Sequence, residues 1–498
     1  MKIKKIIALS LLTAVACFSV LTACGDTSED SGNADNTQNT QPADDDNMPG
    51  EPQQSITEMV FSKLPDADYD GYIFRAVTAP SSWSEFLERM ITSEETGDIV
   101  FDAVYYRNLV IEDHFNVKIE PIVRDAGAIT GFVRNSVMAG DDAFDLVLHW
   151  TQEMGSMPFN EFFIEMRQQT HIDMSQPWYP QKTNNAMTVN GKQYFVHSEM
   201  TMNTSALAYT NFYNLELAKE YDLPDVYPVV LGGKWTFDAM LEHIKGVSRD
   251  VNGDGEMRIE DDIFGYGTTL SPPESLLAMQ YGMGQFTAVI ESGEPRLAFD
   301  AGRMSAIVDR LNYLFHVSGD GIATPIAWDT AITAFREGRL LICNAVMMMA
   351  DRRFRDMEDA YTVLPMPKFD EAQQEYYTTM PSGSSTVVNG IPITVGDIER
   401  STVIFEALSA IGYEKIRPAF FEVALKTKYA RDDQVSQMFD LVMDSNTIDF
   451  GFIYDGNARV RDVINNSVIR NNNTVVSDFE ATQDRAIIFY ETIMERYQ

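Results

Sequence analysis

The stretch Tyr72-Ile73-Phe74-Arg75-Ala76-Val77 begins an alternation of strands and helices that decides the fold class. Its β-branched and aromatic residues favour a strand. Residues 98–115 then carry apolar side chains at helical spacing, and residues 116–120 alternate as a second strand. Residues 130–138 predict another helix, and residues 144–148 predict a short buried strand. This order is typical of an α/β domain with a largely parallel sheet.

The end of the third predicted strand marks one side of an expected binding site. Ligands of open α/β sheets bind beyond the carboxyl ends of the strands. His149 and Trp150 directly follow residues 144–148, so we expect them near a ligand.

A second α/β region begins near residue 207, and its pattern is again mixed. The predicted helices cover residues 214–221, 273–281, 302–317, 330–337 and 399–411, with a further capped helix starting near residue 236. The predicted strands cover residues 340–346, 362–365 and 391–393. The C-terminal third is predicted to be almost wholly helical.

The first 24 residues have the layout of a secretory signal. Lys2, Lys4 and Lys5 precede an apolar run over residues 6–20, which is too short for a membrane span. Leu21-Thr22-Ala23-Cys24 resembles a bacterial lipoprotein processing box, which implies cleavage before Cys24 and diacylation of its sulfur. Residues 24–57 are polar and acidic, so we expect a disordered tether there.

Charge and cysteine content exclude several function classes. The chain has 38 basic and 74 acidic residues, for a net charge of −36, so we expect no electrostatic binding of nucleic acid. Cys17 would leave with the signal and Cys24 would carry lipid. Only Cys343 remains, and it lies in an apolar run, so no disulfide within the chain is expected.

Several short motifs in order along residues 70–498 resemble the extracellular solute-binding proteins of the sugar-binding class, family 1, to which maltose-binding protein belongs. They are Asp145-Leu146-Val147, Gly191-Lys192-Gln193-Tyr194-Phe195, Lys234-Trp235-Thr236, Phe335-Arg336-Glu337-Gly338-Arg339-Leu340 and Val363-Leu364-Pro365-Met366-Pro367-Lys368. Tyr209-Thr210-Asn211 has one residue inserted between the usual tyrosine and asparagine, so Asn211 receives no ligand role.

The resemblance implies a two-lobed α/β fold, the periplasmic-binding-protein fold of type II, with the ligand in a cleft between the lobes and a helical C-terminal part. The first lobe would be residues 58–207 plus 384–428. The second would be residues 208–383 plus 429–498. The signal peptide is placed at residues 1–23. The family also implies a monomer held at the outer face of the bacterial cell membrane, with closure recognised by an ABC transporter permease.

Aromatic residues are the expected carbohydrate contacts, because sugars present flat apolar faces that stack on rings while polar groups satisfy the hydroxyls. The candidate residues lie in predicted loops or at strand ends: Trp83, Trp150, Tyr179, Tyr209 and Trp328. Trp235 is expected to pack internally.

Residues 250–261 match the spacing of a calcium loop. Asp250, Asn252 and Asp254 occupy positions 1, 3 and 5, Glu256 supplies a carbonyl at position 7, and Asp261 stands at position 12. Oxygen donors of this kind favour Ca²⁺ over transition metals. The sequence therefore predicts a structural calcium site; the alternative is a solvated acidic turn.

The leading prediction is a lipid-anchored receptor without enzymatic activity that captures a sugar or oligosaccharide for an ABC importer. Three alternatives stay open at this point. One is a secreted carbohydrate-active enzyme with a carboxylate pair. Another is a surface protein that binds polysaccharide without transport, and the third is a receptor of the same fold for a peptide or other solute.

Overall fold

The computed structural model describes residues 55–81, 87–270, 274–324, 329–380, 386–425, 433–454 and 459–498, without the side chains of residues 422–425, 433 and 461. By its internal contacts the chain divides into Met1–Gln53 and Gln54–Gln498, and everything below concerns the second unit. The predicted signal peptide, Cys24 and all of the predicted tether except residues 55–57 lie outside the described residues.

The first sheet has the strand order β12-β3-β1-β2. Its strands are β1 (Tyr72–Thr78), β2 (Val117–Val123), β3 (Leu146–Trp150) and β12 (Val387–Gly390). β1 pairs in parallel with β2 and β3, and β12 runs antiparallel to β3. The prediction of a largely parallel sheet from residues 72–148 is therefore confirmed.

A buried carboxylate fixes β3 beside β1. Asp145 is fully buried and accepts hydrogen bonds from the backbone N–H of Arg75 at 2.8 Å, from Nε of Arg75 at 2.9 Å and from the hydroxyl of Tyr72 at 2.8 Å. Bonds to an ionised acceptor are stronger than neutral ones, so this cluster holds the two strands in register.

The predicted helix at 98–115 is confirmed to within one residue, and the predicted helix at 130–138 begins four residues earlier, at Ala126. α3 (Ile99–Phe115) starts after Asp98, whose carboxylate accepts the N–H groups of Val100 and Phe101, and ends at Asn116 in the left-handed conformation. The other helical segments of this part are α1 (Ile56–Lys63), α2 (Glu88–Ile91), α4 (Ala126–Ala139), α5 (Thr151–Ser156), α6 (Phe159–Phe162), η1 (Met166–Gln168), α7 (Gln181–Asn185), η2 (Glu199–Thr201) and α8 (Asn203–Ala206).

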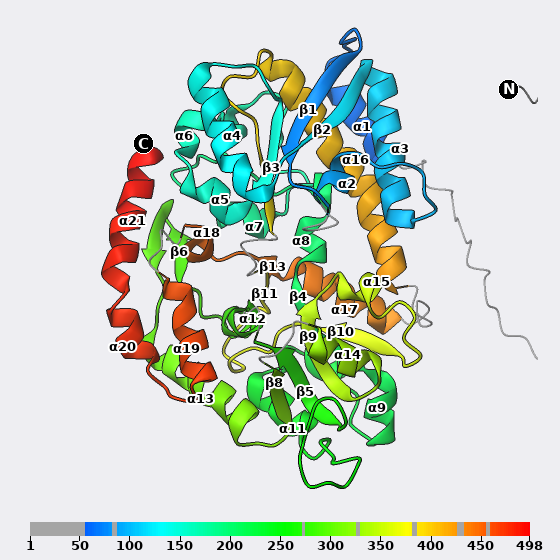
Figure 1. Ribbon diagram of the computed structural model, residues 1–498, viewed down its shortest axis with the longest axis vertical. Helices are drawn as coiled ribbons and strands as arrows, with labels where there is room; N and C mark the ends of the chain where they lie inside the picture. The colour runs from blue at the N-terminus through cyan, green and yellow to red at the C-terminus, as the bar shows by residue number, and fades with distance from the viewer. Residues whose placement is uncertain are drawn as a thin grey trace, which may run out of the picture. The chain divides into compact units, whose positions relative to one another are not determined.

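The second sheet has the strand order β10-β4-β9-β5-β8. Its strands are β4 (Tyr209–Asn214), β5 (Phe264–Thr269), β8 (Gly321–Thr324), β9 (Leu340–Val346) and β10 (Tyr361–Leu364). β5 pairs in parallel with β8 and β9, whereas β4 runs antiparallel to β9 and β10. Figure 1 shows the first sheet above and the second below, with α8 and β13 between them.

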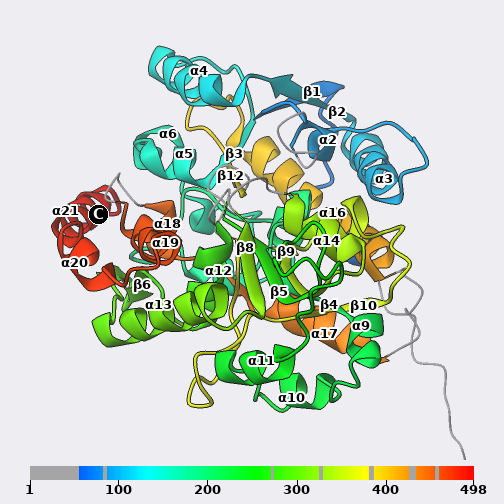
Figure 2. The ribbon, with the colours of Figure 1, turned by 60° about the horizontal axis from the view of Figure 1, so that its bottom comes forward.

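Helices cover the second sheet. α13 (Ala301–His316) contacts β8, and α14 (Thr330–Arg336) contacts β5 and β9, as Figure 2 shows. The remaining helices of this region are α9 (Leu215–Glu220), α10 (Tyr227–Leu231), α11 (Phe237–Ile244), α12 (Glu274–Gly282) and α15 (Met349–Arg352). The predicted helices at 302–317 and 330–337 and the strand at 340–346 are confirmed to within one residue at each end.

The longest helix is α16 (Ile398–Leu425), which runs through Pro418. The sequence pattern predicts a helix that ends at residue 411, and proline disfavours a helix interior. The helix continues because it packs against α1, α3, η2 and α15, and this tertiary packing outweighs the cost of the proline. The predicted strand at 391–393 is wrong: the strand is β12, which ends at Gly390.

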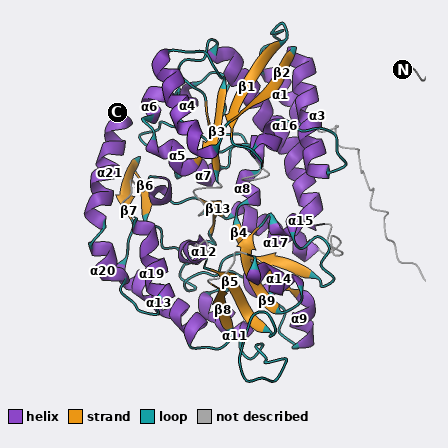
Figure 3. Ribbon diagram, viewed as in Figure 1, coloured by secondary structure: helices purple, strands orange, loops and turns teal. Residues whose placement is uncertain are grey.

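The C-terminal residues form mostly helices, as predicted (Figure 3). They are α17 (Asp433–Asp444), α18 (Phe450–Ile453), η3 (Val460–Asp462), α19 (Val463–Ile469), α20 (Val475–Glu480) and α21 (Gln483–Arg496). Two small sheets stand beside them: β6 (Ala288–Glu291) with β7 (Glu294–Leu297), and β11 (Thr378–Thr379) with β13 (Asn446–Thr447).

The fold contains two principal sheets, and the ends of their strands are candidate positions for a binding site. The strands of the first sheet come from residues 72–150 and 387–390, and those of the second from residues 209–364, so the mixed α/β fold with two principal sheets agrees with the prediction. The bounds of the two lobes stay a prediction. No helix among the described residues has the length and apolar character needed to cross a membrane.

Candidate functional site

The carboxyl edge of the first sheet presents Trp150. Val77 of β1 pairs with Val147, and Trp150 pairs with Val387 of β12. Trp150 therefore lies three residues beyond the last β1–β3 pair, at the edge where open α/β sheets bind ligands. Its half-buried indole stacks on the imidazole of His149, with 5.6 Å between ring centroids and 22° between planes.

The carboxyl edge of the second sheet presents Tyr209. Tyr209 pairs with Val346 at the end of β9, and Thr269 at the end of β5 pairs with Thr324 at the end of β8. Burial raises the pKa of Tyr209, and the nearby carboxylate of Glu274 adds to this effect. The phenol, which is 8% exposed, is therefore neutral at physiological pH and carries a hydroxyl rather than a charge.

The histidines near the first edge carry no charge at neutral pH. Burial lowers the pKa of His149 to about 4. It lowers the pKa of His197 to about 3, against a smaller opposing effect of the Val387 backbone. Both side chains are buried, so the half-buried indole of Trp150 is the aromatic group at this edge.

Hydrogen bonds fix the segment that follows Trp150. The hydroxyl of Thr151 donates to the carbonyl of Thr386 at 2.8 Å, and Nε2 of Gln152 donates to the carbonyl of Phe452 at 2.9 Å. α5 is thus tied both to β12 and to α18, so Trp150 stands on a rigid support.

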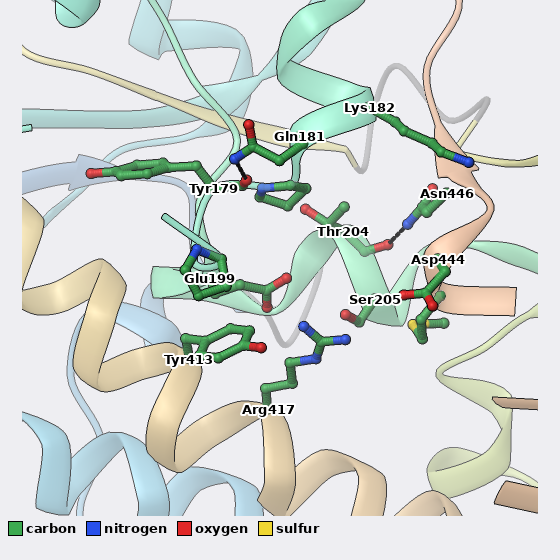
Figure 4. A pocket seen from close by; sticks show the side chains of 13 residues that line it. Tyr179, Gln181, Lys182, Glu199, Thr204, Ser205, Tyr413, Arg417, Asp444 and Asn446 are labelled. Atoms are coloured by element: carbon green, nitrogen blue, oxygen red, sulfur yellow. Dashed lines mark hydrogen bonds between the residues drawn. The ribbon is translucent and has the colours of Figure 1, made fainter. Parts of the chain in front are cut away.

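Tyr179 lies away from both edges, in a second location. It is fully buried, its hydroxyl bonds to Glu406 on α16, and it lines a cavity of about 410 Å³. We call this cavity the hinge pocket, because it is lined by α7, η2, α8, α16, α17 and β13, and α8 leads directly into β4 (Figure 4). Besides Tyr179, its principal polar lining residues are Glu199, Thr204, Ser205, Arg417 and Asn446.

The loop at residues 250–261 is closed by hydrogen bonds between its own residues. The two carboxylate oxygens of Asp250 accept the N–H groups of Gly253 and Gly255 at 2.7 and 2.9 Å. Asn252 accepts from Asp254, and Asp254 accepts from Glu256. The exposed guanidinium of Arg258 pairs with the carboxylates of Asp254 and Glu256.

At the end of this loop, the buried acidic residue is Asp262 and not Asp261, which the sequence predicts at position 12. Asp262, one residue after Asp261, is buried and accepts the N–H groups of Val251 and Arg258 at 2.9 and 2.8 Å, whereas Asp261 is exposed. Across the described ranges, no group of three or more His, Cys, Asp or Glu side chains converges closely enough to hold a metal ion.

The structure thus distributes the predicted site residues over several places. Trp150 and Tyr209 stand at the edges of different sheets, Tyr179 lines the hinge pocket, and the residues of the 250–261 loop lie together. Trp83, Trp328 and Cys24 lie outside the described residues. Sequence reasoning missed Glu199, Arg417 and Asn446, because no local pattern relates residues so far apart in the chain.

Comparison with known proteins shows the fold. No protein-family model matches the sequence, and no curated protein matches it. The structure is similar to UgpB from Mycobacterium tuberculosis, solved with glycerophosphocholine, at a TM-score of 0.54 and 15% identity over 79% of this chain and 96% of that one.

Two further solved structures agree. UspC from M. tuberculosis matches with a TM-score of 0.54 and 13% identity, over 83% of this chain and all of that chain. A cyclo/maltodextrin-binding protein complexed with maltotetraose matches with a TM-score of 0.50 and 13% identity, over 85% of this chain and 97% of that one. The chain therefore has the two-lobed α/β fold of these binding proteins.

Proposed function

We propose that this chain, which has the fold of two-lobed binding proteins, captures a carbohydrate between its lobes and delivers it to an ABC importer. The main support for the proposal is that the structural similarity covers nearly the whole length of the solved binding proteins. The similarity covers between 96% and 100% of each of the three solved chains, so it involves both sheets rather than one shared α/β unit.

The chemistry of the edges supports a carbohydrate. The fold itself accommodates different solutes, since one similar protein was solved with glycerophosphocholine and another with maltotetraose. Here the first edge presents the indole of Trp150 and the second presents the neutral phenol of Tyr209. A ring that stacks on a sugar face and a hydroxyl that bonds a sugar hydroxyl are what carbohydrate recognition requires.

Binding and lobe closure, rather than catalysis, form the proposed activity. The structural neighbours are binding proteins, and a hinged two-lobed fold closes around its ligand without chemical change. The closed form is the species that a permease would recognise.

The proposal includes a lipid anchor at Cys24 and a position at the outer face of the cell membrane, where the chain works as a monomer. The sequence of residues 1–24 supports the anchor and the location. Mass spectrometry of the cell-derived protein should find an N-terminal diacylated cysteine. A Cys24→Ala variant should leave the membrane fraction, and retention of that variant would contradict the anchor.

The proposal also includes a structural Ca²⁺ held by the 250–261 loop. The loop curls around the carboxylate of Asp250, which supports the proposal. The guanidinium of Arg258 pairs with Asp254 and Glu256, so Ca²⁺ binding requires it to leave Asp254. Asp250, Asn252, Asp254 and Asp261 would supply side-chain oxygens and Glu256 its backbone carbonyl.

A thermal-shift screen against mono- and oligosaccharides tests the central claim. A ligand that binds only the folded state raises the midpoint, with a stabilisation of about 2.7 kcal/mol at a hundredfold excess over Kd. Trp150→Ala should remove the shift, whereas Tyr106→Ala should keep it, because Tyr106 is an aromatic residue with 45% exposure on α3. The absence of a shift with every sugar would overturn the carbohydrate assignment.

A further inference from the structure

The C-terminal helices connect the surroundings of the first sheet with those of the second. We call residues 449–454 and 459–498, which contain α18, η3, α19, α20 and α21, the C-terminal strap. Figure 1 and Figure 2 both place α19, α20 and α21 at the left of the molecule and α16 at the right. Because the two views differ by a turn about the horizontal axis, the strap and α16 lie on opposite sides of the molecule.

Buried aromatic rings attach the strap to the segments around the first sheet. Tyr454, which follows α18, and Tyr497, which follows α21, are each 1% exposed, and their hydroxyls are 3.0 Å apart. The ring centroid of Phe159 on α6 lies 4.9 Å from that of Tyr497 and 5.8 Å from that of Tyr454. The ring of Tyr194 lies 5.4 Å from that of Tyr497. The ring of Phe195 lies 6.0 Å from that of Tyr454. Buried aromatic side chains contribute strongly to packing, so this attachment resembles a piece of protein core.

Two basic side chains strengthen the same attachment. Nη1 of Arg496 in the strap donates to the carbonyl of Met157 at 2.9 Å. In the opposite direction, Nζ of Lys192 donates to the carbonyl of Gln498 at 2.8 Å. Hydrogen bonds from charged donors are stronger than neutral ones, so these two bonds hold the last turn of the strap in place.

α5 and α18 also lie in close contact. A Cβ at Gly155 of α5 would stand 2.9 Å from the carbonyl oxygen of Ile453 and 3.3 Å from the ring of Tyr454. Glycine at residue 155 therefore allows the strap to lie directly against the helix that follows β3, and a side chain there would push the two helices apart.

The other part of the strap packs against the helices that cover the second sheet. The ring of Phe479 on α20 stacks on that of Phe299, with 3.5 Å between centroids and 3° between planes. Nδ2 of Asn473 donates to the carbonyl of Ser305 at 3.0 Å and to the carboxylate of Asp309 at 2.7 Å, both on α13. α19 and α20 contact α13, and α19 also contacts α12. The strap is therefore fixed at both of its ends.

The β6–β7 hairpin forms a second link beside the strap. The carboxylate of Asp449 accepts the N–H groups of Thr287 and Ala288, which begin the hairpin. At the turn of the hairpin, the carbonyl of Gly293 accepts the N–H of Asn190 at 2.8 Å. Asn190 belongs to the segment between α7 and η2, so the hairpin also reaches the surroundings of the first sheet.

We propose that the C-terminal strap limits how far the regions of the two sheets can move apart. On the opposite side, α16 contacts α1, α3 and α15. Rotation of one region about that side would produce its largest displacement at the strap. A link at the greatest distance from a rotation axis restricts the angle most, so the strap sets the widest open state of the molecule. This device belongs to the protein alone and does not depend on which solute it binds.

The distance between two spin labels on the full chain, measured by electron double resonance without any sugar, tests this proposal. The labels are attached to Asn135→Cys on α4 and Glu242→Cys on α11, which are exposed positions beside the first and second sheets. The remaining reactive cysteines are removed as Cys17→Ser and Cys24→Ser. Cys343 is fully buried and stays unlabelled. With the strap intact, we expect a single narrow distribution of distances.

Two variants release the strap in different ways. The double variant Lys192→Met, Arg496→Met removes both charged bonds at the end of the strap, and Gly155→Val forces α5 and α18 apart. Each should add a population at longer distances. Arg485→Met is the matched control, because it removes a positive charge from an exposed position on the same helix and should keep the narrow distribution. The melting midpoint of each variant establishes that it is folded, and the surface substitutions decide the outcome if Gly155→Val does not fold.

The strap is overturned if the double variant and Gly155→Val give the same distances as Arg485→Met. It is also overturned if Arg485→Met lengthens the distances as much as the double variant, because the change would then follow from net charge. Since no sugar is present in the measurement, neither result bears on carbohydrate capture, which the thermal-shift screen decides separately.

Discussion

The hydroxyl of Tyr179 donates a 2.5 Å hydrogen bond to Oε2 of Glu406, a buried carboxylate on α16. The indole N–H of Trp178 donates to the other oxygen of the same carboxylate at 3.1 Å. Two consecutive aromatic residues of a loop are thereby fixed to the longest helix. Burial raises the pKa of Glu406 to about 7, against the opposing effect of these two hydrogen bonds.

This carboxylate should make stability depend on pH. Because the pKa of Glu406 is higher in the folded state than its ordinary value of 4.5, the folded state binds the proton more tightly. The contribution of Glu406 to stability is therefore full below about pH 4.5 and falls as pH rises through 7, by on the order of 3 kcal/mol. Glu406→Gln should remove this decline, and urea unfolding of both proteins at pH 5 and pH 8 measures it.

Tyr179→Phe is the matched control for that experiment. It keeps the carboxylate but removes one donor to its ionised form, so its loss of stability between pH 5 and pH 8 should be at least as large as that of the wild type. A Glu406→Gln variant with the same pH dependence as the wild type would show that Glu406 does not titrate in this range.

η2 lies so close to α16 at Gly412 that a side chain at this position would clash with the backbone of η2. A Cβ at Gly412 would lie 2.4 Å from the carbonyl oxygen of Glu199, a backbone atom that cannot swing aside. Gly412→Ala should therefore lower the free energy of unfolding by about 2 kcal/mol or more. Gly131→Ala, in α4 with nothing within 4 Å of its Cβ, should raise it by roughly 0.5–1 kcal/mol. Equal denaturation midpoints for the two variants would contradict the steric argument.

Asp449 connects the C-terminal helices to the β6–β7 hairpin. Its fully buried carboxylate accepts four bonds: from the N–H and the hydroxyl of Thr287 at 2.7 and 2.6 Å, from the N–H of Ala288 at 3.1 Å and from the N–H of Gly451 at 2.7 Å. Asp449→Asn replaces one acceptor oxygen with a donor that faces N–H groups.

The Asp449→Asn variant should lose about 2–3 kcal/mol of stability, because buried donors are left without an acceptor. Thermal unfolding measures this loss. Asp478→Asn serves as the comparison, because within the described ranges the half-buried carboxylate of Asp478 accepts one side-chain bond, from the hydroxyl of Thr474 at 2.8 Å. Its melting midpoint should change little. A loss as small in Asp449→Asn as in Asp478→Asn would refute the role of the four bonds.

If the 250–261 loop binds Ca²⁺, the ion should stabilise the protein, and this effect should be lost only when a ligand position of the loop is substituted. The melting midpoint should rise with CaCl₂ and fall again with a chelator. Asp250→Ala should abolish this response, because Asp250 occupies position 1 and organises the loop through Gly253 and Gly255. Glu260→Gln should retain it, since position 11 supplies no ligand. A response that Glu260→Gln loses as fully as Asp250→Ala would indicate general charge screening instead of a site.

Local pattern predicted the elements whose apolar spacing is regular. The strand at 340–346 and the helix at 98–115 were recovered because periodicity and an N-cap aspartate both act within a few residues. The extension of α16 to Leu425 was missed, since the packing that carries it through Pro418 comes from segments distant in sequence.

Some features of the candidate site could also be predicted from the sequence, and others could not. The position of Trp150 at a strand edge follows from strand order, which the sequence pattern could predict. The pairing of Tyr179 with Glu406 could not be predicted, because the residues stand 227 positions apart and neither has a distinctive local signature. The hinge pocket brings together Glu199, Arg417 and Asn446 for the same reason: its geometry is a property of tertiary packing.

The length of α16 has a mechanical consequence. Its 28 residues span about 42 Å at 1.5 Å per residue, and it touches α1 and α3 beside the first sheet and α15 beside the second. Because one continuous helix contacts elements beside both sheets, a tilt of α16 would move its contacts with α1 and α3 together with its contact with α15.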